Sequence, residues 1–183
     1  MTHMDETKVL AVDDEADLVD LYAEFLSPEY GVRTATSGTD ALEKIDATVD
    51  VVLLDRRMPD MSGREVLRVL RERGHDCQVA MLTAVDPEQD ILEMPFDDYR
   101  TKPVTRRELI ELVENLIDRT TYDEQNRELF QLASKRAALE VAGNDDTAEY
   151  RELVERIETL RSDIRTAQDE IGTKAAFKEL LAD

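Results

Sequence analysis

Short apolar runs separated by turn-forming residues dominate the first two thirds of the chain. Three of these runs, residues 9–12, 51–54 and 79–82, hold four apolar residues each and lead into polar residues. A run this short, bounded by turn formers, is typical of a buried strand rather than of a helix. Two weaker segments, residues 31–36 and 96–101, complete a set of five predicted strands.

Apolar residues at helical spacing follow several of these predicted strands. The spacing i, i+3, i+4, i+7 occurs in residues 18–25 and again in residues 109–116, and residues 41–45 give a weaker helix. Strands that alternate with helices predict right-handed crossovers and one sheet covered on both faces. We therefore expect a five-stranded, doubly wound, parallel α/β domain in residues 1–118.

The remaining residues, 119–183, differ in kind, with no strand signal and no proline. Thr121 and Asp146 are each followed three residues later by a glutamate, which is a pattern typical of helix starts. Gly143-Asn144-Asp145 between them indicates a helix stop and a turn. Two helices joined by a short turn predict an antiparallel helical hairpin as a second domain.

The second of these helices carries apolar residues spaced 4-3-4-3-4, which is the a/d seam of a coiled coil. Its members are Leu153, Ile157, Leu160, Ile164, Ala167 and Ile171. After Gly172, residues 174–181 predict a short terminal helix with its own apolar side. A hairpin this small buries little apolar surface, so we expect it to pack on a second chain or on its own α/β domain.

Polar residues follow four of the five predicted strands at the point where each strand ends. Asp13 and Asp14 follow the first strand, Asp55 the third, Thr83 the fourth, and Lys102 the fifth. In an open parallel α/β sheet, residues just past the carboxyl ends of the strands line the crevice where ligands bind. The pattern therefore predicts one site that gathers three carboxylates, a hydroxyl and an ammonium group.

This set of residues, in this order, resembles the receiver domain of two-component response regulators. The resemblance implies a flavodoxin-like fold, with Asp55 as the phosphoacceptor and with Lys102 and Thr83 assisting the transfer. It also implies a sensor histidine kinase as the partner that donates the phosphoryl group. Such chemistry acts on the protein itself, so we do not expect an enzyme with a separate substrate.

The resemblance further implies a Mg²⁺ ion held by Asp14, Asp55 and the backbone carbonyl of Arg57, with Asp13 acting through water. Clustered carboxylates repel one another, and a hard cation that prefers oxygen ligands would hold them together. An alternative class, the phosphatases of the haloacid dehalogenase type, expects a second aspartate two residues after the nucleophile. Arg57 stands at that position.

The resemblance also implies a switch residue, Tyr99, which stands three positions before the lysine and couples to Thr83. We expect phosphate to draw Thr83 inward and to leave space that Tyr99 enters. The stretch before Tyr99 departs from the family pattern, because Pro95 shortens any helix between the fourth and fifth strands.

Residues 119–183 resemble the HalX-type domain that follows receivers in halophilic archaea. They hold 10 lysines and arginines against 15 aspartates and glutamates, and DNA binding depends largely on cations that neutralise phosphates. At ~1 M salt the Debye length is only ~3 Å, so distant acidic residues would not prevent DNA binding in a halophile's cytoplasm. We expect a homodimer or a partner protein, with a transcriptional regulator whose tail binds DNA as the alternative.

Composition favours a halophilic protein over an ordinary acidic regulator. The formal net charge is −20, and 6 lysines stand beside 17 arginines. A strongly acidic surface keeps a protein soluble where salt screens its self-repulsion. The acidic start of the chain is unlike a signal peptide, and no apolar run approaches the ~18 residues of a membrane span. We expect a cytoplasmic protein with no membrane contact.

Overall fold

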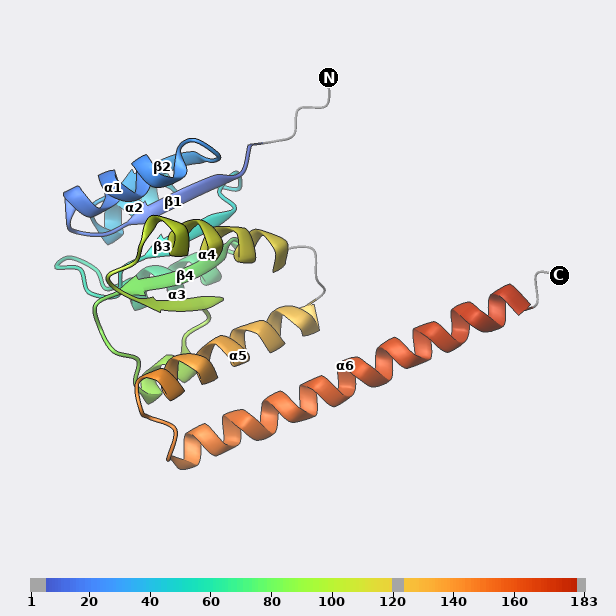
Figure 1. Ribbon diagram of the computed structural model, residues 1–183. Helices are drawn as coiled ribbons and strands as arrows, with labels where there is room; N and C mark the ends of the chain where they lie inside the picture. Colours follow the sequence, from blue (N-terminus) through green and yellow to red (C-terminus); the bar gives the residue numbers. More distant parts are fainter. Residues whose placement is uncertain (1–5, 120–123, 181–183) are drawn as a thin grey trace, which may run out of the picture.

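A single parallel sheet of five strands organises the first part of the molecule (Figure 1). The computed structural model describes residues 6–119 and 124–180. The strand order is β2-β1-β3-β4-β5, which confirms the predicted doubly wound architecture. The strands are β1 (Lys8–Val12), β2 (Gly31–Ala35), β3 (Val51–Leu54), β4 (Gln78–Thr83) and β5 (Asp98–Thr101).

The strand register brings the carboxyl ends of neighbouring strands to one edge of the sheet. Val12 of β1 pairs with both Ala35 of β2 and Leu54 of β3, and Thr83 of β4 pairs with Thr101 of β5. All of these are the last residues of their strands. The polar residues that follow the strands therefore start from a common edge.

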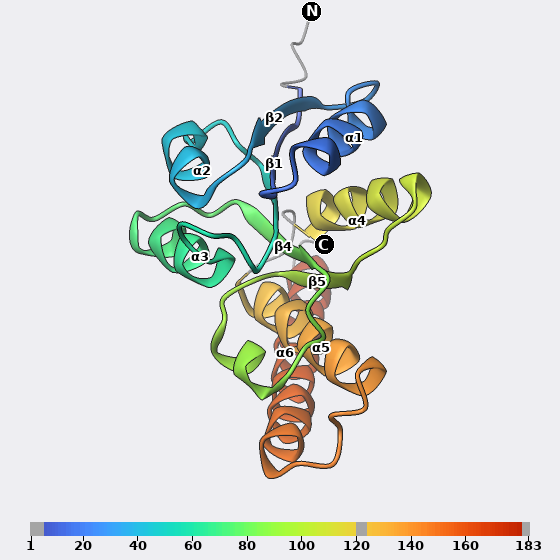
Figure 2. The same cartoon turned by 90° about the vertical axis from the view of Figure 1, so that its left-hand side faces the viewer.

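Helices cover both faces of the sheet (Figure 2). One face packs on α1 (Ala16–Leu26) and α4 (Arg106–Arg119), and the other packs on α2 (Gly38–Lys44) and α3 (Gly63–Glu72). The central strand β3 is buried along its whole length, as expected for a parallel strand covered on both sides.

The connection from β4 to β5 forms only a short 3₁₀-helix, η1 (Gln89–Glu93). Pro95 follows it closely, as the sequence predicts for a shortened helix. The helix α5 (Glu124–Val141) contacts both η1 and β5, and Figure 2 shows it beside them. It covers the part of the sheet flank that η1 is too short to cover.

The second long helix, α6 (Ala148–Leu180), returns antiparallel to α5 (Figure 1), which confirms the predicted hairpin. We call α5 and α6 the tail. Four residues of the predicted seam are buried within the chain: Leu153, Ile157, Leu160 and Ile164. These four positions of the seam therefore pack inside one molecule, while Ala167 is half-buried.

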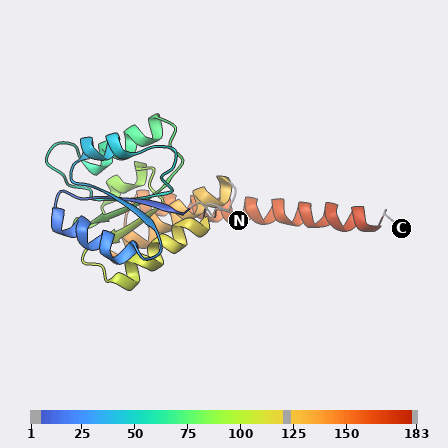
Figure 3. The ribbon, with the colours of Figure 1, turned by 90° about the horizontal axis from the view of Figure 1, so that it is seen from above.

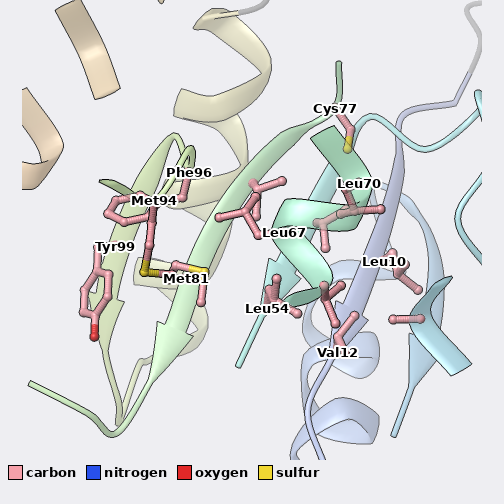
Figure 4. Close-up of a cluster of buried hydrophobic side chains, with 14 of the residues drawn as sticks. Leu10, Val12, Leu54, Leu67, Leu70, Cys77, Met81, Met94, Phe96 and Tyr99 are labelled. Atoms are coloured by element: carbon pink, nitrogen blue, oxygen red, sulfur yellow. The ribbon is translucent and has the colours of Figure 1, made fainter. Parts of the chain in front are cut away.

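The tail shares its apolar core with the sheet. Leu139 of α5 and Ile157 of α6 belong to the same buried cluster as Phe96, Met94 and Tyr99. Figure 4 shows the last three residues at the β5 side of that cluster. The hairpin thus uses its own α/β domain as the packing surface that its small size requires.

Two details of the predicted tail are wrong. No separate terminal helix follows Gly172, because α6 continues through it to Leu180. Thr147, rather than Asp146, caps α6, since its hydroxyl accepts a hydrogen bond from the Tyr150 backbone N–H at 3.1 Å.

Other predictions for the tail concern groups that the structure does not describe. The predicted cap at Thr121, the side chain of Ile171 and the apolar side of residues 174–181 lie outside the described residues. Within the described ranges, no helix is both long enough and apolar enough to cross a membrane.

Candidate functional site

Three carboxylates meet at the carboxyl edge of the sheet, where the sequence predicts them. Asp13 and Asp14 follow β1, and Asp55 follows β3. One carboxylate oxygen from each lies within 4.8 Å of the others. Asp13 and Asp55 are buried, at 1% and 6% exposure, while Asp14 is exposed. The cluster is therefore open to solvent on the Asp14 side.

Lys102 carries the positive charge of this cluster. Its backbone N–H donates to the Thr83 carbonyl at 2.8 Å, which fixes the start of the side chain beside β4. Its ammonium group forms an ion pair with Asp13 and lies 3.8 Å from Oδ2 of Asp55. The Lys102–Pro103 peptide bond is cis. Lys102 thus contacts two of the three acidic residues.

Burial raises the pKa of Asp55 above its ordinary value, because the charged form loses hydration. The Asp13 carboxylate raises this pKa further, while the Lys102 ammonium group lowers it. Hydrogen bonds from the Thr83 side chain and the Arg57 backbone also lower it. Lys102 and these hydrogen bonds therefore offset the effect of burial on the pKa of Asp55 only in part.

A pocket of about 520 Å³ opens above these residues. Its walls come from the loops after β1, β3, β4 and β5, as expected for ligand crevices of this sheet type. The lining residues are Asp14, Glu15, Asp55, Arg57, Thr83, Ala84, Val85, Asp86, Glu88 and Lys102. The pocket thus brings together all the predicted site residues except Asp13, which lies beneath it, and Tyr99.

Tyr99 lies behind the pocket rather than in its lining. The side chain is buried, at 4% exposure, and its hydroxyl donates to the Val85 carbonyl at 2.6 Å. Its ring lies 5.7 Å from that of Phe96. Tyr99 therefore contacts the loop that begins at Thr83, but it occupies the inward position already.

Two features of the site were not predicted. Gly63, the first residue of α3, lies so close to the β3 end that a Cβ there would be 2.1 Å from the Asp55 carbonyl oxygen. Arg56 forms an ion pair with Asp90 of η1. Gly63 therefore lets α3 approach the site, and Arg56 ties the residue after Asp55 to η1.

The donor set suits Mg²⁺. Three carboxylates supply oxygen ligands, and one of them, Asp14, faces solvent; Mg²⁺ commonly combines one or two carboxylates with waters and phosphate oxygens. The negative charge also affects Tyr22 of α1, whose pKa is raised to about 12, first by burial and then by Asp13 and Asp55. A cation at this cluster would relieve that repulsion.

Comparison with protein families divides the chain into two matched parts. Residues 9–114 match the response regulator receiver domain. Residues 118–181 match the HalX domain. The two matches lie in the order that the sequence predicts, with the receiver domain first and the HalX domain second.

Some related proteins are similar to nearly the whole chain, and others are similar to its first part. A Haloferax volcanii protein, named as a candidate transcriptional regulator, is 45% identical over 189 residues, which is 97% of this chain and 32% of that protein. The Escherichia coli transcriptional regulatory protein CpxR is 38% identical over 124 residues, covering 66% of this chain and 53% of CpxR. The chain thus spans about a third of the first relative and half of the second.

Solved structures are similar to the sheet domain. A CheY-like receiver domain protein from Methanospirillum hungatei is 27% identical, with a TM-score of 0.60, over 63% of this chain and 97% of that chain. The response regulator TrrA from Thermotoga maritima, solved in complex with Mg²⁺–BeF, is 35% identical with a TM-score of 0.55. That likeness covers 60% of this chain and 98% of TrrA.

Proposed function

This chain belongs to the response regulators in which a receiver domain is followed by a HalX domain, and we propose on that basis that Asp55 is its phosphoacceptor. The observation that carries the proposal is the meeting of Asp13, Asp14 and Asp55 with Lys102 at one edge of the sheet. The donor is a phosphohistidine on a sensor histidine kinase.

The transfer exchanges one bond for another. An oxygen of the Asp55 carboxylate attacks phosphorus, the P–O bond forms, and the P–N bond to histidine breaks, with its electron pair remaining on the imidazole nitrogen. The Lys102 ammonium group lies 3.8 Å from Oδ2 of Asp55 and faces the incoming negative charge, and Thr83 offers a hydroxyl. Both groups stabilise charge on the phosphoryl oxygens.

Asp14, Asp55 and the Arg57 carbonyl are the groups that would bind Mg²⁺ directly, with Asp13 acting through water. The ion, when bound, neutralises charge on the phosphoryl oxygens. Asp13 also holds Lys102 by an ion pair, so it sets where the ammonium group lies. Water that reaches the exposed Asp14 side later removes the phosphoryl group from Asp55.

Tyr99 is the proposed link from the pocket to the tail. Its hydroxyl binds the Val85 carbonyl, two residues after Thr83, and it shares a cluster with Leu139 of α5. Phosphate that draws in Thr83 favours the inward position of Tyr99 that this structure has. The positions of Tyr99 are states in equilibrium, and the phosphoryl group on Asp55 raises the population of the inward one.

The tail, within residues 119–183, is the proposed output part, and residues 1–118 are the receiver. We favour contact with a second copy or with another protein, made by the part of α6 that extends past α5 (Figure 3). Transcriptional regulation through DNA binding by the tail is the second candidate, supported by the description of the Haloferax relative. Salt-titrated DNA binding in molar KCl separates the two.

Intact-mass measurement after incubation with acetyl phosphate and Mg²⁺ in molar KCl tests the phosphoacceptor. We expect the mass of one phosphoryl group to be added to the wild type and to Asp20→Asn, an exposed control on α1. Asp55→Asn should gain nothing, and EDTA should prevent the gain. Tyr99→Ala should still gain mass while the tail no longer responds in amide exchange.

A phosphoryl group that is hydrolysed quickly would escape the mass measurement, so beryllofluoride binding is measured in the same sample. Wild-type protein that neither gains mass nor binds beryllofluoride would contradict the proposal, as would an equal gain by Asp55→Asn.

A further inference from the structure

One wall of the phosphoryl pocket is a segment that the tail contacts from outside. The segment, residues 84–88, which we call the pocket wall, leads from β4 to η1, and Val85, Asp86 and Glu88 line the pocket. It is a loop, so its position depends on what holds it. Tyr99 holds it from the sheet side, through the hydrogen bond to the Val85 carbonyl.

The turn between α5 and α6 holds the same wall from the other side. The Asn144 side-chain amide donates to the Pro87 carbonyl at 2.9 Å. Gln89, the first residue of η1, donates to the Asn144 carbonyl and to the Thr147 hydroxyl, both at 3.2 Å. These three bonds join residues at least 55 positions apart.

The turn itself is well fixed, so it can act as a support. Gly143 has a φ of +75°, which ends α5 in the left-handed conformation. The Asn144 backbone N–H then donates to the Leu139 carbonyl at 2.9 Å, and Thr147 caps α6. The Asn144 side chain is therefore presented to Pro87 by a turn whose backbone is already hydrogen-bonded.

The rest of α5 keeps the turn in place against η1. Lys135 is buried, donates to the Leu92 carbonyl of η1 at 2.9 Å and lies 5.5 Å from the centre of the Phe96 ring. Gln131 donates to Asp97 at 2.9 Å. Contacts along the whole connection from Pro87 to Asp97 therefore come from the tail.

We propose that the turn between α5 and α6 is a positioning device for the phosphoryl pocket, in which Asn144 and Gln89 hold the pocket wall over Asp55. The proposal rests on the proposed function of Asp55 and adds a role for the tail in the chemistry itself. A fixed wall keeps Thr83 where a phosphoryl oxygen needs it, which is preorganisation. Because coupling is reciprocal, an occupied pocket also tightens the turn.

Asn144→Ala tests the proposal, with Asp145→Ala as the matched control in the same turn, where the side chain is exposed. Mg²⁺ affinity and beryllofluoride affinity are measured separately on the full chain. We expect Asn144→Ala to weaken beryllofluoride binding about two- to tenfold, the effect of one hydrogen bond, and to leave Mg²⁺ binding unchanged. Asp145→Ala should change neither affinity.

Mg²⁺ affinity is the readout that separates positioning from general damage, because the acidic cluster stands on β1 and β3 and not on the wall. An equal loss of Mg²⁺ and beryllofluoride affinity in Asn144→Ala overturns the positioning role. Unchanged or tighter beryllofluoride binding overturns it as well.

Amide exchange of residues 85–93 without any ligand keeps the proposal testable if the proposed function fails. We expect faster exchange there in Asn144→Ala than in the wild type or in Asp145→Ala. Equal exchange in all three proteins overturns the positioning role of the turn. If the wild type binds no beryllofluoride but Asn144→Ala still exchanges faster, the result counts only against Asp55 as the phosphoacceptor.

Discussion

Asp55 shows most directly how a buried residue of the acidic cluster carries a cost in stability. It is buried beside Asp13, and burial raises its pKa. A folded-state pKa above the unfolded value means that the folded protein binds the proton more tightly, so ionisation destabilises the fold. The cost is absent below the unfolded pKa, ~3.9, and is complete above the raised pKa.

Asp55→Asn should therefore stabilise the protein without Mg²⁺ at pH 7, by about 0.5–2 kcal/mol, the usual size of a stabilising substitution. The gain should shrink as the pH falls toward the unfolded pKa, because wild-type Asp55 is then protonated too. Urea unfolding at several pH values measures this, with Asp163→Asn, an exposed position on α6, as the control. A gain that is the same at every pH would contradict the assigned cause.

At this scale the sequence predicts the residues that directly follow apolar runs. Asp14, Asp55, Thr83 and Lys102 are found because a strand end is visible in the sequence. Gly63 gives no signal, since its importance lies in a close approach between two elements. Arg56 and Asp90 are 34 residues apart, and their pairing depends on where η1 lies.

Among the elements, η1 and α5 depend on each other. A 3₁₀-helix of five residues leaves the flank beside β5 uncovered, and α5 covers it with Leu139, which is fully buried. The sequence predicts the shortened helix from Pro95. It leaves open whether the hairpin packs on a second chain or on its own α/β domain, because the docked face of α5 is largely polar. Four residues of that face bind the segment from η1 to β5: Arg127, Gln131, Ser134 and Lys135.

Leu139→Ala should destabilise the whole chain, by about 2–5 kcal/mol as for other large-to-small core changes. Val141→Ala, two residues along the same helix and 90% exposed, is the matched control and should change little. Thermal unfolding followed at the sheet and at the tail measures both variants. If the tail alone melts earlier in Leu139→Ala, the shared core does not couple the two parts.

For the whole molecule, charge is the dominant feature. A net charge of −20 sets acidic side chains close together, as with Asp20 and Glu24, which are exposed one helical turn apart on α1. Like charges at this spacing are destabilising. Salt screens them, since the Debye length falls from ~10 Å at 0.1 M to ~3 Å at 1 M.

The free energy of unfolding should therefore rise between about 0.1 M and 1 M KCl, because the Debye length shortens over this range. The urea midpoint at several KCl concentrations measures it. Asp20→Asn combined with Glu24→Gln should be more stable than the wild type in low salt and gain less from KCl. An equal gain in both proteins would mean that salt acts through something other than these charges.

The unequal lengths of the two tail helices have a mechanical consequence. At 1.5 Å per residue, the 33 residues of α6 span about 50 Å and the 18 residues of α5 span about 27 Å. The end of α6 thus extends past the body as an arm (Figure 3). The 16 residues from Ile164, the last position of α6 that the structure describes as buried, to Leu180 span about 24 Å, so a bend of about 10° there would move the tip by roughly 4 Å. A small change in the packed part of α6 would thus be magnified at its end.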